Sequence, residues 1–525
     1  MVSGKILNPI FKSKYFILLL FIFAFLLRLP GINRPEIADE GKAVRAVGKD
    51  FYGIVQQLSS EDSQPPLFYF MIKIWGKVSN SYPWLRLLSV IWGALTCVLI
   101  YKIGKIIFDD NLGLFAYILA ATSPLFIYLS QYLRPYSLGV LETVACVWII
   151  SEIIKEKETR RLLFLFSLCG LCLLASLYTV YYSAFVIISL NIFCILYLML
   201  KDRKKLLYWL TTQIIVFILY LPWIPFYLKQ MKQLADSTFW HYPALHQVKM
   251  GFYIGDVHVG SILKALLSLF HFSDIYVLST RYSTHFPKML LISIAAVTPI
   301  IIGYVIYKGY KKLYNCQKVE GIIFLLSSVI FLPLFFSIVY SLLGDLGILS
   351  PISINVRYFG QSVIFFTFFL VAFYIGIKRI FLRVGVLLLI CVVFLTQINY
   401  VYNYPFNIYK KLFNELKTEK KITLLVSFPA PLDAILDAKT ARQLKARYEI
   451  VVVTPSNVAA EIEKIRKSNQ FYLLNYVKAE YVLLHSESLN KFKNLVQKNG
   501  YVQYSSTNIS DLYRLSIFRR LKNNI

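Results

Sequence analysis

The chain has 525 residues, of which 57% are hydrophobic and 16% charged, with a mean hydropathy of +0.59 and a formal net charge of +28. A soluble domain has about 45–50% apolar and about 25% charged residues, so the composition indicates a membrane protein. The lysines and arginines gather in short loops between apolar segments. This pattern is typical of topology signals and anionic-lipid contacts, and it argues against nucleic acid as a partner.

Apolar segments long enough to cross a membrane follow one another along residues 1–400. A span needs about 20 mostly apolar residues, and by that rule the sequence predicts about eleven transmembrane helices. The first is interpreted as a retained span, because no small-x-small cleavage site follows it. The predicted limits are 15–30, 84–107, 112–129, 136–154, 162–179, 181–200, 206–227, 286–307, 320–341, 358–377 and 381–400.

The short basic loops predict how the chain is oriented. If the spans are counted as above, five of these loops and the N-terminal lysines fall on one side of the membrane. Basic residues mark the cytoplasm, so the N-terminus is predicted inside and, after an odd number of spans, the C-terminus outside. We therefore expect a multi-pass protein of the cell membrane, inner or plasma, with large exterior loops at 31–83 and 228–285 and a periplasmic tail.

The tail, residues 401–525, differs in character and predicts a small soluble α/β domain. Thr454-Pro455 has the sequence of a helix start, with proline at the first helical position. The predicted strands are Lys421–Phe428, Glu449–Val453, Tyr481–Leu484 and Tyr501–Tyr504, and the other predicted helices are Pro431–Arg447 and Leu489–Lys498.

An adjacent acidic pair, Asp39-Glu40, follows the first span by about ten residues. A carboxylate at the membrane surface can take a proton from an attacking hydroxyl or amine. The structural alternative is that Asp39 is an N-cap and Glu40 a favourable residue of the first helical turn. The spacing leaves both interpretations open.

A proline pair lies further along the same loop, in Gln64-Pro65-Pro66. The apolar segment that follows is too short for a span and contains Lys73 and Lys77, which favours an interfacial helix. The prolines would fix the angle at which the chain enters it. We expect this segment to form a lid or platform beside the acidic pair.

Two arginines are predicted at the outer ends of spans, in Arg134-Pro135-Tyr136 and Arg357-Tyr358. An arginine at the bilayer edge is costly unless it has a partner. A lipid phosphate fits the guanidinium fork, whereas snorkelling to ordinary headgroups is the structural alternative. Two arginines together with an acidic pair would supply both a cation for a leaving phosphate and a base.

Five of the six histidines lie in loop 228–285, where Asp256-Val257-His258 is the pattern nearest to a metal site. The spacing fits no ligand set, so no metal site and no cofactor are predicted, although a divalent metal is compatible with the loop.

Taken in order, several segments resemble GT-C type glycosyltransferases of family 39, which include protein O-mannosyltransferases and the aminoarabinose transferase of lipid A. The resemblance covers about the first 150 residues and one point near residue 357. The matching pieces are Asp39-Glu40, Gln64-Pro65-Pro66-Leu67-Phe68-Tyr69, Trp84-Leu85-Arg86-Leu87-Leu88-Ser89, Ser123-Pro124-Leu125-Phe126-Ile127-Tyr128, Arg134-Pro135-Tyr136-Ser137 and Arg357-Tyr358.

The resemblance implies a GT-C fold and transfer of a sugar from a polyprenyl-phosphate donor, with inversion, on the non-cytoplasmic face. The acceptor would be an envelope glycolipid, polysaccharide or protein, and no metal would be needed. The tail has no WWDYG motif, which argues against an oligosaccharyltransferase.

The resemblance also implies roles for particular residues. Asp39 would be the catalytic base, with Glu40 supporting it. Donor-phosphate binding would fall to Arg134, Tyr136, Arg357 and Tyr358, and the substrate loop would comprise Gln64, Pro65, Pro66 and Arg86.

The main alternative is a transporter or flippase of lipid-linked sugars. Transporters show inverted repeats and charged or broken helices at the midplane, whereas this sequence has no repeat and few charges within its spans. The exceptions are Glu142 and Glu152, and Glu142 is interpreted as a structural partner of Arg134. A membrane anchor or sensor for the tail is a second alternative, but it leaves the acidic pair and both arginines unexplained.

Overall fold

The computed structural model describes most of the first 403 residues and the strands of the tail. Two units are present, one formed by residues 1–32, 43–236 and 251–402 and the other by 33–42, 237–250 and 403–525. The described ranges are 15–33, 40–62, 64–236, 253–254, 257–258, 269–270, 288–316, 321–345, 356–403, 423–427, 450–452, 470–476, 501–508 and 513–520, with the single positions 494 and 497.

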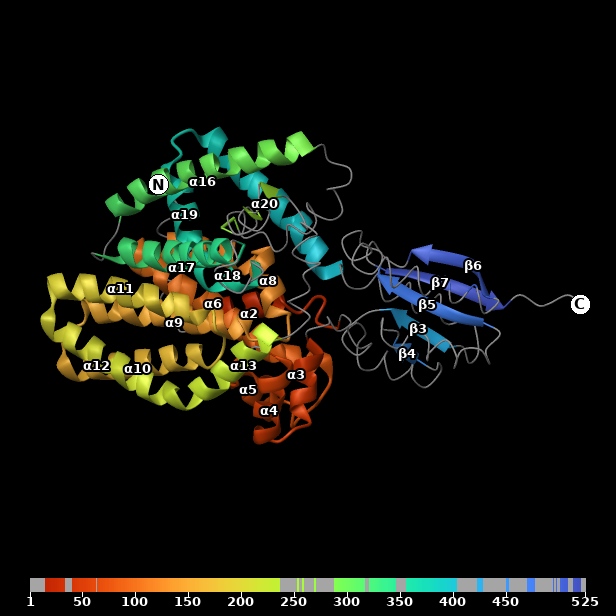
Figure 1. Cartoon of the computed structure of the whole chain (residues 1–525). Coiled ribbons are helices and arrows are strands. Elements are labelled where there is room, and N and C mark those ends of the chain that lie inside the picture. The colour runs from red at the N-terminus through yellow and green to blue at the C-terminus, as the bar shows by residue number, and fades with distance from the viewer. Residues whose placement is uncertain are drawn as a thin grey trace, which may run out of the picture. The chain divides into compact units, whose positions relative to one another are not determined.

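The first unit is built from helices, and α9 to α12 run side by side in it (Figure 1). The helices, several of which are short, are α2 (Phe16–Leu26), α3 (Glu40–Val47), α4 (Phe51–Glu61), α5 (Leu67–Trp75), α6 (Tyr82–Ile107), α7 (Asp110–Ala121), α8 (Pro124–Ser130), α9 (Tyr136–Lys155), α10 (Thr159–Leu177), α11 (Ser183–Lys201), α12 (Arg203–Tyr220), η1 (Leu221–Trp223), α13 (Ile224–Asp236), α16 (Lys288–Cys316), α17 (Ile322–Asp345), α18 (Val356–Val363), α19 (Phe366–Gly376) and α20 (Ile380–Asn403).

The prediction of a polytopic helical membrane protein is confirmed. Within the described ranges, seven helices are long and apolar enough to cross a membrane, and the count rises to nine if each of two bent helix pairs is one span. The other two predicted spans fall on α2, which has 11 residues, and on α16, which has 29 and is not among the nine. The number eleven, and the orientation that depends on it, stay predictions.

Two predicted spans are broken. The α7–α8 pair bends by 62° and the α18–α19 pair by 54°. The first break has a local cause, because Ser123 caps α8 by accepting from the Phe126 amide and Pro124 is the first residue of the new helix. The α8 and α18 halves pack against each other, so both breaks lie in the same part of the unit.

Helix α6 packs against α2, α7, α8 and α9. Its crossing with α7 depends on two glycines: a Cβ added to Gly104 would lie 2.8 Å from the Gly113 Cα, and one added to Gly113 would lie 2.8 Å from the Lys105 amide nitrogen. Small residues allow backbones to approach this closely in membranes.

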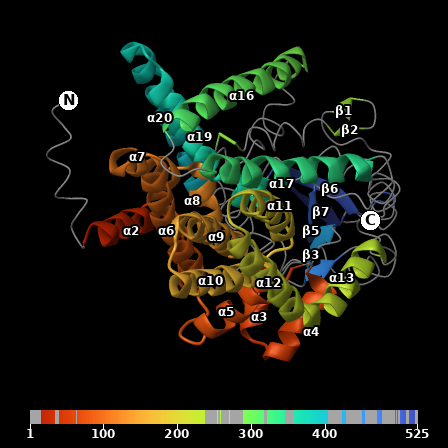
Figure 2. The same cartoon turned by 90° about the vertical axis from the view of Figure 1, so that its left-hand side faces the viewer.

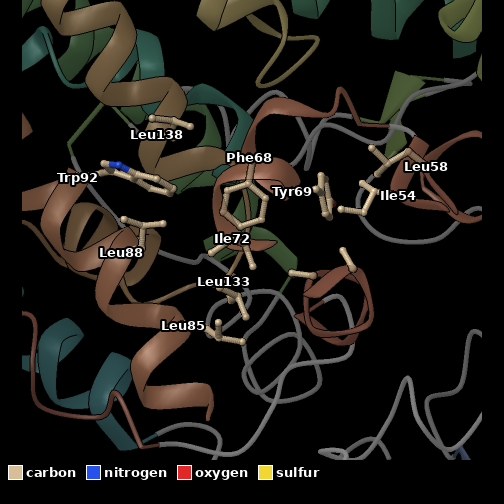
Figure 3. Close-up of a cluster of buried hydrophobic side chains, with 12 residues drawn as sticks. Ile54, Leu58, Phe68, Tyr69, Ile72, Leu85, Leu88, Trp92, Leu133 and Leu138 are labelled. Atoms are coloured by element: carbon tan, nitrogen blue, oxygen red, sulfur yellow. The ribbon is translucent and has the colours of Figure 1, made fainter. Parts of the chain in front are cut away.

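Helices α4 and α5 lie together beside the long helices, in both views (Figures 1 and 2). A buried apolar cluster joins α5 to α6 and α4: the Phe68 ring of α5 lies 6.0 Å from the Trp92 ring of α6, and Tyr69 points toward Ile54 and Leu58 of α4 (Figure 3). At the far end of α5 the rings of Trp75 and Trp84 stack 4.6 Å apart. Each of these indoles donates to the carbonyl oxygen of the other residue, over 2.7 and 3.0 Å.

The tail contains a five-stranded sheet in the order β4-β3-β5-β7-β6. Strand β3 pairs in parallel with β4 and β5, and the remaining pairs are antiparallel. The strands are β3 (Thr423–Ser427), β4 (Ile450–Val452), β5 (Gln470–Tyr476), β6 (Tyr501–Asn508) and β7 (Tyr513–Arg520); a short hairpin of the first unit joins β1 (Tyr253–Ile254) to β2 (Val257–His258).

The predictions for the tail are met in part. The sequence predicted strands where β3, β4 and the first half of β6 lie, and it missed β5 and β7. The predicted strand Tyr481–Leu484 and the predicted helices lie outside the described residues, apart from helical positions 494 and 497. The α/β character of the tail therefore stays a prediction.

Candidate functional site

A buried ion pair joins the end of α4 to the connection between α8 and α9. Arg134 lies between α8 and α9, and Asp62 is the residue that ends α4. The Nη1 and Nη2 atoms of Arg134 lie 2.7 and 3.2 Å from the two Asp62 oxygens, in a bidentate arrangement. The side chains are only 4% and 5% exposed, so water does little to weaken their attraction.

Tyr69 of α5 completes this pair. Its hydroxyl donates to Asp62 Oδ2 over 2.5 Å and accepts from Arg134 Nη1 over 2.9 Å. Burial raises the pKa of Tyr69 well above its usual value; Arg134 works against this shift and Asp62 adds to it. Burial, the largest single influence, acts to lower the pKa of Arg134, but Asp62, Tyr69 and Tyr136 together outweigh it, and that pKa is raised. The phenol and the guanidinium therefore both keep their protons.

The second predicted arginine lies among three tyrosines. Arg357 Nη1 is 3.3 Å from the Tyr132 hydroxyl, and the guanidinium carbon is 5.6 Å from the Tyr136 ring centre and 5.5 Å from that of Tyr358. Both distances allow a cation–π attraction, which holds the guanidinium against the two rings. The rings are packed in series: Tyr136 stacks on Tyr132 at 6.1 Å and meets Tyr358 edge-on at 5.6 Å.

Tyr136 connects the two arginines. It begins α9 only two residues after Arg134, and it presents its ring to Arg357. Two arginines separated by more than 200 residues in the sequence thus share one neighbour. We call Asp62, Tyr69, Arg134, Tyr136 and Arg357, with the flanking Tyr132 and Tyr358, the arginine–tyrosine cluster.

Glu142 is not the partner of Arg134, and that prediction was wrong. Its Oε1 accepts from the Thr179 hydroxyl over 2.9 Å. Asp62 takes the role instead because the end of α4 is brought against the α8–α9 connection, whereas Glu142 lies further along α9, facing α10. The prediction relied on Glu142 lying about two helical turns from Arg134, but the partner of Arg134 is set by contacts between helices.

The predicted substrate-loop residues lie in two places. Gln64, Pro65 and Pro66 are buried at the entrance to α5, whose first amide, that of Leu67, donates to the Tyr178 carbonyl over 2.9 Å. Arg86 of α6 is fully buried. It donates to the Ile32 carbonyl over 2.8 Å and so holds the chain that leaves the first apolar helix.

Asp39, the predicted base, lies outside the described residues. Glu40 is the first residue of α3 and is buried, a position in which a carboxylate is favoured by the helix dipole. Among the residues whose placement is described, no group of three or more histidine, cysteine, aspartate or glutamate side chains could hold a metal ion. The region of loop 228–285 that carries the histidines is described only in short pieces, at 253–254, 257–258 and 269–270.

Three members of the arginine–tyrosine cluster were not predicted: Asp62, Tyr69 and Tyr132. Asp62 and Tyr69 border the Gln64-Pro65-Pro66 segment on its two sides. The sequence did contain a signal for Asp62, because an arginine predicted at a bilayer edge requires a counter-charge and Asp62 is an acidic residue of a predicted exterior loop. Nothing in the spacing, however, relates residue 62 to residue 134.

Comparison with known proteins gives one family match. Residues 63–226 match the family described as dolichyl-phosphate-mannose-protein mannosyltransferase. This stretch includes Gln64-Pro65-Pro66, Arg86 and Arg134-Pro135-Tyr136. No curated protein matches the chain.

Solved structures with a similar course of the chain include the oligosaccharyltransferase of Archaeoglobus fulgidus in complex with Zn and sulfate. It is 12% identical, the match covers 93% of this chain and 71% of that one, and the TM-score is 0.47. Another is ArnT from Cupriavidus metallidurans bound to undecaprenyl phosphate, at 11% identity, with 97% of this chain and 99% of that one covered and a TM-score of 0.44.

Proposed function

We propose that the chain is a membrane glycosyltransferase that takes a sugar from a polyprenyl-phosphate donor, because residues 63–226 match the family described as dolichyl-phosphate-mannose-protein mannosyltransferase. The acceptor is an envelope glycolipid, polysaccharide or protein on the non-cytoplasmic face, and the reaction inverts the anomeric centre. The observation that supports this proposal most strongly is that Tyr136, which begins α9 two residues after Arg134, has its ring against Arg357, so that the two arginines meet at this residue.

The two arginines have different parts in this proposal. Both terminal nitrogens of Arg134 lie on Asp62, and one of them also reaches Tyr69, so Arg134 chiefly fixes the start of α9 and the Tyr136 ring. Arg357 is the cation that approaches the donor phosphate, with Tyr136 and Tyr358 holding the plane of its guanidinium. A fixed guanidinium is suited to stabilise the negative charge that develops on a departing phosphate.

Asp39 is the proposed base, supported by Glu40. The acceptor O–H gives its proton to the Asp39 carboxylate while the acceptor oxygen attacks the sugar C1. The new C1–O bond forms on the face opposite the phosphate, and the bond between C1 and the phosphate oxygen breaks. Polyprenyl phosphate leaves with the electron pair of that bond, and the configuration at C1 is inverted.

Gln64 is the proposed contact to a sugar hydroxyl. It is 7% exposed, and its Oε1 is buried with no hydrogen-bond partner within the described part of the chain. A buried carbonyl oxygen without a donor is costly, and a substrate hydroxyl would remove that cost. Pro65 and Pro66 restrict the backbone on which this side chain is held.

The two bent helix pairs are a structural feature that also fits the alternative function, a flippase. Broken helices that meet near a substrate site are typical of transporters, and the α7–α8 and α18–α19 breaks were not expected from the sequence. A flippase would move the lipid-linked sugar without cleaving it, so the two functions differ in their product.

The experiment compares the wild-type chain with Asp39→Asn in membranes that receive a panel of radiolabelled polyprenyl-phosphate sugars. We expect label in an acceptor with the wild type and none with Asp39→Asn at equal expression. Asp50→Asn is the matched control, since Asp50 is an exposed helix cap on the same loop and asparagine caps equally well. Transfer by Asp39→Asn at the wild-type level would show that Asp39 is not the base. Label that moves to the other leaflet while still attached to the polyprenyl phosphate would favour a flippase.

A further inference from the structure

One glutamine outside the arginine–tyrosine cluster holds the backbone on which Asp62 is carried. Gln230 lies on α13 and is only 2% exposed. Its Nε2 is 2.9 Å from the Leu58 carbonyl oxygen, 3.2 Å from that of Asp62 and 3.2 Å from that of Gln64. An amide nitrogen has two hydrogens, so these carbonyls share them in a three-way contact.

These carbonyls need a donor from outside their own segment. Leu58 is in the last turn of α4, where carbonyls have no partner within the helix. Gln64 precedes Pro65 and Pro66, which carry no N–H that could turn back to the loop. An unpaired buried carbonyl is costly, so the path of this loop depends on the side chain that supplies the hydrogens.

Gln230 is itself held in place. Its Oε1 accepts from the Tyr181 hydroxyl, which in turn accepts from the Trp223 indole N–H over 3.0 Å. The Tyr181 ring meets Tyr227 edge-on at 5.0 Å, and Trp223 stacks on Phe226 at 5.1 Å. Both acceptor and donor sides of the amide are therefore used, which fixes its orientation.

We propose that Gln230 is a positioning residue for the sugar-transfer site, because it sets the place of Asp62 opposite Arg134. The inference rests on the proposed function. The path runs from the Gln230 amide to the Asp62 backbone, from the Asp62 carboxylate to Arg134, and from Arg134 along the chain to Tyr136, whose ring lies against Arg357. No substrate contact is assigned to Gln230 itself.

The first arm of the test measures how firmly Gln230 holds the loop at residues 58–67, by hydrogen–deuterium exchange of the purified full-length chain. Gln230→Met keeps the side-chain volume and removes the N–H donors. We expect faster exchange of the amides in residues 58–67, with the long helices unchanged. Gln213→Met is the matched control, because Gln213 is a partly buried glutamine of α12 that bonds Asn191. Unchanged exchange at 58–67 would overturn the inference.

The second arm measures the role in transfer. We expect Gln230→Met to lower kcat by roughly 10- to 100-fold while the KM for the acceptor stays the same, the size of effect that a small misplacement of reacting groups produces. In an Asp62→Asn background, Gln230→Met should lower kcat little further, because both substitutions act through the Asp62–Arg134 pair. Full additivity of the two losses would contradict the proposal.

A milder variant tests the proposal even if Gln230→Met fails to fold. Tyr181→Phe removes only the hydroxyl that holds Gln230, so it should raise exchange at 58–67 and reduce transfer in the same direction but less strongly. If Tyr181→Phe changed neither the exchange nor the transfer, the proposal that Gln230 positions the loop would be contradicted. If the wild type itself transferred no sugar, the proposed function would fail, and the exchange arm would still decide whether Gln230 fixes the loop.

Discussion

At the scale of single residues, the burial of the Arg134–Asp62 ion pair makes both side chains important for stability. Removing two charges from water is expensive, and the mutual attraction repays this only with good geometry and further hydrogen bonds. The bidentate contact and the Tyr69 hydroxyl provide both. Loss of one partner would leave the other charge buried without its counter-ion.

We therefore expect Asp62→Asn to lower the free energy of unfolding by roughly 3 kcal/mol, within the range for breaking a buried ion pair. Arg134→Gln should have a similar effect, and the double variant should lose less than the two single losses added together. The measurement is the thermal unfolding midpoint in detergent. Asp109→Asn, which changes the N-cap of α7, is the control and should be nearly neutral. Additive losses would mean that the pair is not coupled.

The sequence could predict single members of this site but not their pairing. Arg134 and Arg357 stand out because a charged side chain at a bilayer edge demands an explanation from its residue type alone. Asp62 and Tyr69 do not stand out, because acidic and aromatic residues are common in exterior loops. Their importance depends on the meeting of α4, α5 and the α8–α9 connection, which no local pattern encodes.

At the scale of elements, hydropathy predicted where helices lie but not where they bend. Predicted spans 112–129 and 358–377 each contain a break, since a window average counts apolar residues and is insensitive to a cap within them. Ser123-Pro124 could have revealed the first break, as a helix start inside an apolar run. At the second break, Ile364 and Phe365 are both apolar, so composition gives no such signal.

The crossing of α6 and α7 yields a prediction at this scale. An alanine at Gly104 would place its Cβ 2.8 Å from the Gly113 Cα, a backbone atom that cannot move aside cheaply. We expect Gly104→Ala to lower the thermal midpoint by an amount equivalent to about 1–3 kcal/mol, as overpacking does. Gly303→Ala in α16 is the matched control, because within the described part of the chain no atom beyond the adjoining backbone of its own helix lies within 4 Å of the added Cβ. It should be neutral or slightly stabilising, since alanine is the better helix former. Equal behaviour of the two variants would disprove the close crossing.

At the scale of the whole molecule, the multi-pass character followed directly from composition, while the orientation rests on the basic loops. The chain offers two exposed positions that the predicted topology places on opposite sides, Tyr52 on α4 and Lys157 between α9 and α10.

A membrane-impermeant thiol reagent added to intact cells should therefore label Tyr52→Cys and leave Lys157→Cys unlabelled, in a background without native cysteines. Permeabilised cells should show labelling of both, which controls for reactivity. Labelling of Lys157→Cys alone in intact cells would reverse the orientation and place the arginine–tyrosine cluster at the cytoplasmic face.

The most direct measurement of the central claim is sugar transfer by the purified chain with Arg357 replaced. Arg357→Met keeps much of the side-chain volume and removes the charge proposed to stabilise the leaving phosphate. The predicted result is a loss of roughly 100- to 1000-fold in kcat, the usual effect of removing one such group, with the fold intact by thermal midpoint. Arg203→Met, at the exposed start of α12, should transfer sugar like the wild type. Undiminished transfer by Arg357→Met would contradict the account, because the meeting of the two arginines at Tyr136 would then serve the fold and not the donor phosphate.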